Sequence, residues 1–128
     1  MGSEASVDSL EQLRQCLAEF ASARDWDQFH APKNLAMALI AEAAELVEHF
    51  QWLTEAQSRN LDQQRLAEVR LELADILIFL VRIADKLDVD LIKATRDKIA
   101  INERRYPVDR VRGSALRAQE YRNKDEQM

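Results

Sequence analysis

The middle of this chain contains no residue that breaks a helix. Its two prolines are Pro32 and Pro107, and its two glycines, Gly2 and Gly113, lie outside the stretch between them. A fold built from strands needs turn-forming residues every few positions, so such a shortage in 128 residues disfavours an all-β protein. Residues 33–106 therefore predict helices, and the length, with 47% apolar and 32% charged side chains, predicts one all-α domain.

Apolar residues recur at helical spacing in four segments. The first segment begins with a capping pair, Ser9 and Gln12, and an aromatic-rich loop at residues 26–32 follows it. Residues 54–60 are polar and predict a connection with room for one helical turn. The chain is thus expected to contain four helices, over residues 9–24, 33–53, 62–87 and about 91–106.

The fourth helix has two possible N-terminal caps, Asp88 and Asp90. It should stop at Tyr106, because the residue before a proline is pushed out of the helical region. The expected organisation is a flexible N-terminus at residues 1–8, a folded domain at 9–107 and a mobile or partner-bound tail at 108–128.

The composition excludes several classes of protein. The longest apolar run, residues 76–81, is far shorter than the roughly 20 residues that cross a bilayer. Cys16 is the only cysteine, so there is no disulfide framework and no thiolate metal site. A formal net charge of -5 argues against binding a nucleic acid polymer through a basic surface. We expect a soluble, cytoplasmic protein that does not associate with membranes.

Two short motifs place acids on helices that should be largely apolar. They are Glu42-x-x-Glu45 and Glu72-x-x-Asp75, and a spacing of three puts the acids of each pair on one helical face. The only other non-apolar residue near the second motif is Arg82, so those carboxylates should be buried and need partners. Mg²⁺, or Mn²⁺, bound by oxygen ligands would provide them. Ordinary surface acids with salt links would give the same spacing.

Lys98, Asn102 and Arg105 form a polar row at offsets of four and seven on the fourth helix. Such a row could hold phosphate groups. A solvated basic face would have the same pattern.

The chain has only eight aromatic residues, and three of them fall in two places of interest: Trp26 and Phe29, with His30 beside them, in the first loop, and Trp52 after the second helix. They could stack on a nucleobase, and they could equally anchor a core or an interface.

Together these motifs closely resemble the MazG-like all-α nucleotide pyrophosphohydrolases, and within them the branch of dCTP pyrophosphatases. The resemblance covers about Leu10 to Tyr106; it is carried by residues 24–30, both acidic motifs, residues 50–52 and residues 98–107. It implies hydrolysis of a nucleoside triphosphate between the α and β phosphates, which yields the monophosphate and pyrophosphate. It also implies a four-helix bundle completed by oligomerisation, as a homodimer or homotetramer whose sites use more than one chain.

The resemblance further implies roles for individual residues. Glu42, Glu45, Glu72 and Asp75 become the catalytic carboxylates, acting as Mg²⁺ ligands. The residues implied in substrate binding are Trp26, Asp27, Gln28, Phe29, His30, Trp52 and Phe79 around the nucleoside and Lys98, Asn102 and Arg105 at the triphosphate.

Two positions depart from the branch. This chain has Leu17 where the dCTP pyrophosphatase branch carries a histidine, and Phe79 where the branch carries a tyrosine. Without the tyrosine hydroxyl, a possible hydrogen bond to the nucleoside is lost. The expected substrates are dCTP and 5-modified dCTP. The alternatives are the same fold acting on dUTP or phosphoribosyl-ATP, and a non-catalytic helical oligomerisation module.

Overall fold

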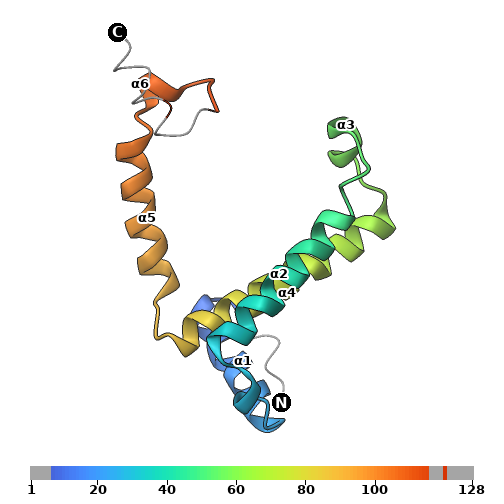
Figure 1. Ribbon diagram of the computed structural model, residues 1–128, viewed down its shortest axis with the longest axis vertical. Coiled ribbons are helices and arrows are strands. Elements are labelled where there is room, and N and C mark those ends of the chain that lie inside the picture. The colour runs from blue at the N-terminus through green and yellow to red at the C-terminus, as the bar shows by residue number, and fades with distance from the viewer. Residues whose placement is uncertain (1–6, 116–119, 121–128) are drawn as a thin grey trace. The chain divides into compact units, whose positions relative to one another are not determined.

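The computed structural model describes residues 7–115 and Glu120. These residues form helices and no strand, which confirms the all-α prediction (Figure 1). In chain order the elements are α1 (Leu10–Ala23), a 3₁₀ turn (Asp27–Phe29), α2 (Pro32–Glu48), α3 (Glu55–Ser58), α4 (Gln63–Lys86), α5 (Leu91–Arg105) and α6 (Val108–Val111).

Side-chain caps fix where three of the long helices begin. Ser9 Oγ accepts a hydrogen bond of 3.2 Å from the backbone N–H of Gln12 at the start of α1. Asp62 caps α4 and Asp90 caps α5 in the same manner. The second helix uses Pro32 at its first turn instead, where the missing N–H has no intrahelical partner to lose. The predicted starts of all four helices are therefore confirmed to within one residue.

The prediction of a helix over residues 33–53 is wrong at its C-terminal end. α2 ends at Glu48, and the backbone N–H groups of Phe50 and Gln51 both bond to the carbonyl of Val47, at 2.9 and 2.8 Å. Residues 49–52 form turns in place of the last predicted turn of helix, and the chain then returns as α4 along α2. The polar connection contains the single helical turn α3, as expected.

Asp88 does not cap the fourth helix. It has a left-handed backbone conformation, with φ of 56°, and it ends α4. The N–H of Val89 bonds to the carbonyl of Ala84 at 2.8 Å, which satisfies one of the last carbonyls of that helix. Asp90 is the cap that α5 uses.

The predicted tail begins with a short helix, α6, that the sequence pattern did not reveal. The remaining terminal residues, 1–6, 116–119 and 121–128, lie outside the described part of the chain, as do most of the residues expected to form a flexible N-terminus and a mobile tail.

α2 and α4 form an antiparallel pair, which is the most extensive contact between helices (Figure 1). At one end, Arg65 Nη1 at the start of α4 donates a hydrogen bond of 2.8 Å to the carbonyl of His49, just after α2. At the other end, Arg82 near the end of α4 contacts His30, just before α2. α1 packs against α4 as well. The middle of both helices is thereby brought face to face.

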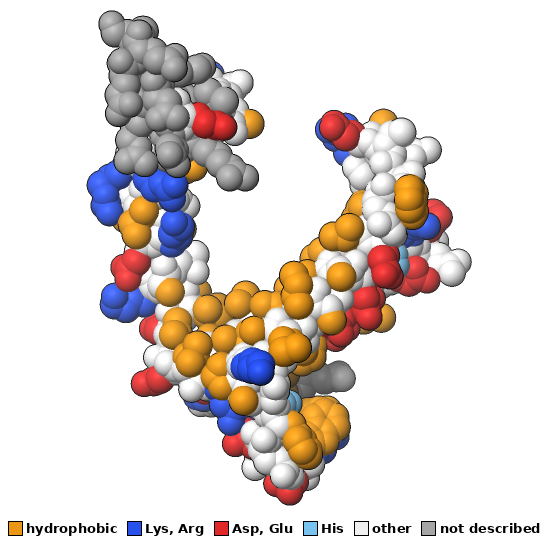
Figure 2. All heavy atoms as spheres, in the orientation of Figure 1, with side chains coloured by type: hydrophobic (Ala, Val, Ile, Leu, Met, Phe, Trp, Pro, Cys, Tyr) orange, Lys and Arg blue, Asp and Glu red, His pale blue; other side chains and the backbone are white. Residues whose placement is uncertain are grey.

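The single chain buries few apolar side chains. Those that are buried among the described residues are Ala21, Leu35, Val69, Val81 and Ala84. Large apolar side chains gather on the outer surfaces of α2 and α4 instead, as Figure 2 shows. Exposed examples on these two helices are Met37, Ile40, Val47, Leu66, Leu71, Leu73, Leu77 and Leu80.

The chain divides into two units, Met1–Val89 and Asp90–Met128. α1 to α4 belong to the first unit, and α5 and α6 belong to the second. Among the described residues, no helix has both the length and the apolar composition that a bilayer span requires.

Candidate active site

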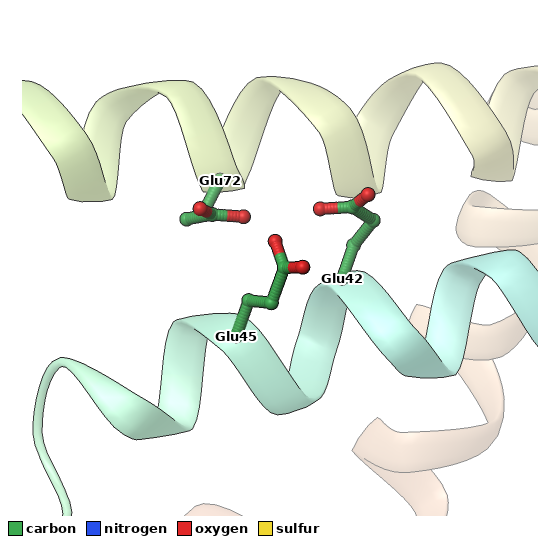
Figure 3. Close-up of side chains that lie close together, drawn as sticks. All are labelled: Glu42, Glu45 and Glu72. Carbon is green, nitrogen blue, oxygen red and sulfur yellow. The ribbon is translucent and has the colours of Figure 1, made fainter.

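Three predicted metal ligands meet between α2 and α4. Glu42 and Glu45 share one face of α2 because they are three residues apart, and Glu72 comes from the facing stretch of α4. Each offers a carboxylate oxygen, and these oxygens all lie within 4.8 Å of one another. Figure 3 shows the three side chains directed into the space between the two helices. The antiparallel pairing therefore joins two motifs that are separated in sequence by the end of α2, the helical turn α3 and the start of α4.

Two oxygens in this cluster are buried without a hydrogen-bond partner among the described residues. They are Oε2 of Glu42 and Oε2 of Glu72. No described lysine or arginine forms an ion pair with any of the three carboxylates. An unpartnered buried oxygen is costly, so the prediction of ordinary surface acids with salt links does not describe Glu42 and Glu72.

The pKa values of the cluster reflect this crowding. Burial, followed by the contacts with Glu45 and Glu72 and then the charges of Glu45 and Asp75, raises the pKa of Glu42 to about 7. Burial and the contact with Glu45 also raise the pKa of Glu72. Three converging carboxylates, two of which have raised pKa values, form a site that a hard divalent cation fits, since oxygen ligands are what such ions prefer.

Asp75, the fourth predicted ligand, lies near the cluster but is not one of the three acids whose oxygens converge. It is half-buried on α4, one turn after Glu72. Its negative charge contributes to the raised pKa of both Glu42 and Glu72. The charge of Asp75 therefore adds to the negative potential of the carboxylate cluster, although its oxygens are not among those that converge.

The loop before α2 is held by a buried arginine. Arg82 is only 3% exposed, and its Nη2 lies 2.9 Å from Oδ1 of Asp27. Its Nε and Nη2 lie 3.3 and 3.2 Å from Nδ1 of His30. Lys86 contacts the same oxygen of Asp27. Asp27 and His30, predicted to bind the nucleoside, thus also have structural partners on α4 that sequence reasoning missed.

Trp26 packs at the end of α1 against a residue that the sequence did not single out. Its ring meets Phe20 edge to face, with centroids 5.7 Å apart. The guanidinium of Arg24 stacks over the Phe20 ring, 3.5 Å from its centroid. The spacing of four between Phe20 and Arg24 on one helix was the available signal. In the same loop, Gln28 donates to the backbone carbonyl of Asp25.

The structure does not bring Trp26 and Trp52 together. Trp26 lies before α2 and Trp52 after it, and the 17 residues of α2 span about 25 Å. Trp52 is 87% exposed, and Phe29 in the first loop is exposed too. One chain therefore cannot close a pocket between these aromatic residues. Phe79 is half-buried on α4, between Asp75 and Arg82 in the sequence.

The predicted phosphate-binding row lies on α5, in the second unit. Lys98, Asn102 and Arg105 are spaced for one face of that helix, as predicted. The Arg105 guanidinium stands 5.6 Å from the centre of the Tyr106 ring, which follows at the helix end.

The comparison with known proteins agrees with this constellation. The profile of the MazG-like family matches residues 38–120, which include all four acids. The chain belongs to the MazG-like family. It is 44% identical to "dCTP pyrophosphatase 1" of Rattus norvegicus over 111 residues, 85% of this chain and 65% of that protein. The bovine protein of the same name is 44% identical over 115 residues, 88% of this chain and 68% of that protein.

The fold of a MazG-like protein is also supported by a solved structure. A pyrophosphatase from Archaeoglobus fulgidus superimposes with a TM-score of 0.73 and 39% sequence identity, covering 77% of this chain and 92% of that one. The chain spans about two thirds of the length of the mammalian relatives.

The raised pKa of Glu42 predicts how stability depends on pH without a divalent cation. In the folded state the Glu42 carboxyl stays protonated up to about pH 7, whereas its ordinary pKa is 4.5. The protonated Glu42 therefore contributes its full stability below pH 4.5, and this contribution is lost as the pH rises through 7. Added Mg²⁺ should restore the lost stability at pH 8, because the cation replaces the proton in balancing the carboxylates.

The measurement is the free energy of unfolding by urea, from pH 4 to 8, for the unmodified protein and Glu42→Gln, which cannot ionise. Relative to the variant, the unmodified protein should lose stability between about pH 4.5 and 7. Glu48→Gln, on the same helix but outside the cluster, is the control and should keep the pH slope. Parallel curves for the unmodified protein and Glu42→Gln would contradict the electrostatic description of the site.

Proposed function

We propose that this protein hydrolyses dCTP and 5-modified dCTP between the α and β phosphates, with Mg²⁺, in the cytoplasmic nucleotide pool. The observation that carries the proposal is the cluster of Glu42, Glu45 and Glu72, in which two buried oxygens lack a partner. The relatives named dCTP pyrophosphatase support the substrate class. Mn²⁺ has similar ligand preferences and would substitute.

Glu42 and Glu72 are the residues best suited to hold the cation, because their oxygens are buried and otherwise unsatisfied. Asp75 adds a further negative charge near these two carboxylates. A bound divalent cation supplies charge neutralisation for the phosphates and activates water for attack. In the reaction, the water oxygen forms a bond to the α-phosphorus, the bond from this phosphorus to the bridging oxygen breaks, and pyrophosphate leaves. Glu45 is the exposed acid of the cluster and stands where solvent can reach it.

Removing an acid should abolish this activity without unfolding the helices. Glu72→Ala and Asp75→Ala should each reduce release of pyrophosphate from dCTP by at least a hundredfold, because the cation loses a ligand or part of its field. Loss of a buried carboxylate can be neutral for folding, so circular dichroism should stay helical.

Glu68→Ala is the matched control for this experiment. Glu68 lies on α4 one turn before Glu72, and it pairs with His49 rather than with the cluster. Its substitution should leave pyrophosphate release close to normal. Near-normal turnover in both Glu72→Ala and Asp75→Ala would disprove the assignment of the active site.

The nucleoside is proposed to bind between aromatic side chains of the first loop, Trp26 and Phe29, and Trp52. Stacking is open to every base, so ring size and hydrogen bonds at the base edge must select the substrate. A pyrimidine with a 5-methyl or halogen substituent gains apolar contact with such walls. The polar row Lys98, Asn102 and Arg105 is proposed to hold the triphosphate.

Loss of either tryptophan should weaken substrate binding. Trp26→Ala and Trp52→Ala should raise KM for dCTP about tenfold, the loss of one stacking contact, and Trp→Phe at either position should recover most of it. Steady-state kinetics with dCTP, 5-methyl-dCTP, dUTP, dATP and dGTP provide the measurement. A purine as the best substrate, or normal KM in both alanine variants, would refute this pocket.

The protein is proposed to act as a homodimer or homotetramer. Exposed apolar residues run along α2 and α4, and a monomer rarely leaves so many uncovered. An oligomer would also allow Trp26 of one chain to approach Trp52 of another, which the span of α2 prevents within one chain.

Light scattering at low micromolar concentration should therefore give a mass at least twice the 14.8 kDa of one chain. Leu71→Glu, which places a charge on the exposed apolar surface of α4, should lower that mass. Arg70→Glu, at the neighbouring exposed position, changes charge without removing apolar surface and is the control. A mass of one chain for the unmodified protein would refute the oligomer.

A further inference from the structure

Arg82 is the one charged side chain that the described part of the chain buries. Nothing in the proposed chemistry at the carboxylates uses it. It lies on α4, where its guanidinium reaches three partners: Asp27, His30 and Asp85, the last through Nη1 at 3.2 Å. Two of the three belong to the first loop, more than fifty residues earlier in the sequence. A buried arginine with two acids and a ring nitrogen around it is held in one orientation.

The charges around Arg82 form a short chain of ion pairs. Asp27 is shared between Arg82 and Lys86, and Asp85 is shared between Arg82 and Arg14 of α1. Glu11 pairs with Arg14 in turn, so three positive side chains alternate with three negative ones. Asp27 is the first residue of the 3₁₀ turn, so this chain of ion pairs fastens the start of the turn to α4.

The same arginine also decides where the proton of His30 lies. Nδ1 of His30 faces two N–H donors of Arg82, at 3.3 and 3.2 Å, so this nitrogen must accept. An accepting Nδ1 carries no proton, which leaves the ring neutral with its hydrogen on Nε2. A second proton would add a fourth positive charge and oppose the guanidinium directly. Burial first, and then the charges of Arg82 and Lys86, lower the pKa of His30, while Asp27 acts in the opposite direction.

We propose that Arg82 is a positioning residue for the nucleoside: it fixes the Asp27–Phe29 turn to α4 and locks His30 as a neutral ring that donates only from Nε2. This rests on the proposed function, in which the first loop contacts the nucleoside. A fixed donor that meets the N3 position favours cytosine, because N3 of cytosine is an acceptor, whereas N3 of uracil or thymine carries a hydrogen. O2 accepts in all three bases and does not discriminate between them.

The decisive measurement is the ¹⁵N chemical shift of both ring nitrogens of His30, recorded by long-range ¹H–¹⁵N correlation at pH 7.5 without nucleotide. The chain has two histidines, so His49, whose Nδ1 lies 3.8 Å from Glu68, serves as the internal reference. His30 should show an unprotonated Nδ1 and a protonated Nε2. A charged ring, or a hydrogen on Nδ1, overturns the proposal, and this result does not depend on whether dCTP is a substrate.

The variant for the second measurement is Arg82→Lys, which keeps the charge but cannot contact Asp27, Asp85 and His30 at once. Its His30 should exchange between tautomers, KM for dCTP should rise about tenfold, and kcat and the Mg²⁺ requirement should change little. Preference for dCTP over dUTP should fall as well. Arg14→Lys is the matched control, because Arg14 belongs to the same chain of ion pairs but does not touch the loop.

Unchanged His30 shifts and unchanged KM in a folded Arg82→Lys protein would overturn the proposal. If Arg82→Lys does not fold, Asp27→Asn removes the charge at the start of the turn and should raise KM in the same way. If the unmodified protein binds and hydrolyses no dCTP, the proposed function fails by itself, and the tautomer of His30 is still decided by the spectrum.

Discussion

The antiparallel contact between α2 and α4 is the interaction on which the carboxylate cluster and the contacts of Arg82 both depend. At its two ends the polar groups are satisfied: Arg65 donates to the carbonyl of His49, and Arg82 is surrounded by acceptors. In its middle they are not, because Glu42 and Glu72 bring buried oxygens that no described side chain pairs. The helices can come together there only if protons or a cation balance the carboxylates. Folding and metal binding are thus two aspects of one contact.

The small buried core explains why this contact matters so much. Few apolar side chains are buried in the described part of a single chain, while many on α2 and α4 face outward. Association of chains and occupation of the carboxylate cluster would therefore each add stability to the same helix pair. A protein built in this way should be most stable when it is assembled and loaded, which is when it is able to act.

Much of this arrangement was predictable because the signals are local. Missing helix breakers predicted the fold class, and a spacing of three placed the acids of each motif together. The capping pair at Ser9 predicted the start of α1, whereas for α5 the sequence offered both Asp88 and Asp90 and the structure uses Asp90. The end of α2 was missed because no glycine or proline marks the turn after Glu48. The partners of Arg82 were missed because they are distant in sequence, and no pattern of spacing announces such contacts. The separation of Trp26 from Trp52, by contrast, follows from the length of the helix between them.

The position of Arg82 along α4 also separates the loop that it holds from the carboxylate cluster. Arg82 follows Glu72 by ten positions, or about 15 Å of helix. Coulomb energy falls with distance, so a charge at 15 Å acts about a third as strongly as one at the 4.8 Å that limits the cluster, before solvent screening reduces it further. The guanidinium is also engaged by Asp27 and Asp85. It therefore contributes little to balancing the carboxylates. In the proposed function, a change in the loop that Arg82 holds would alter the preference for a base without altering the carboxylate cluster.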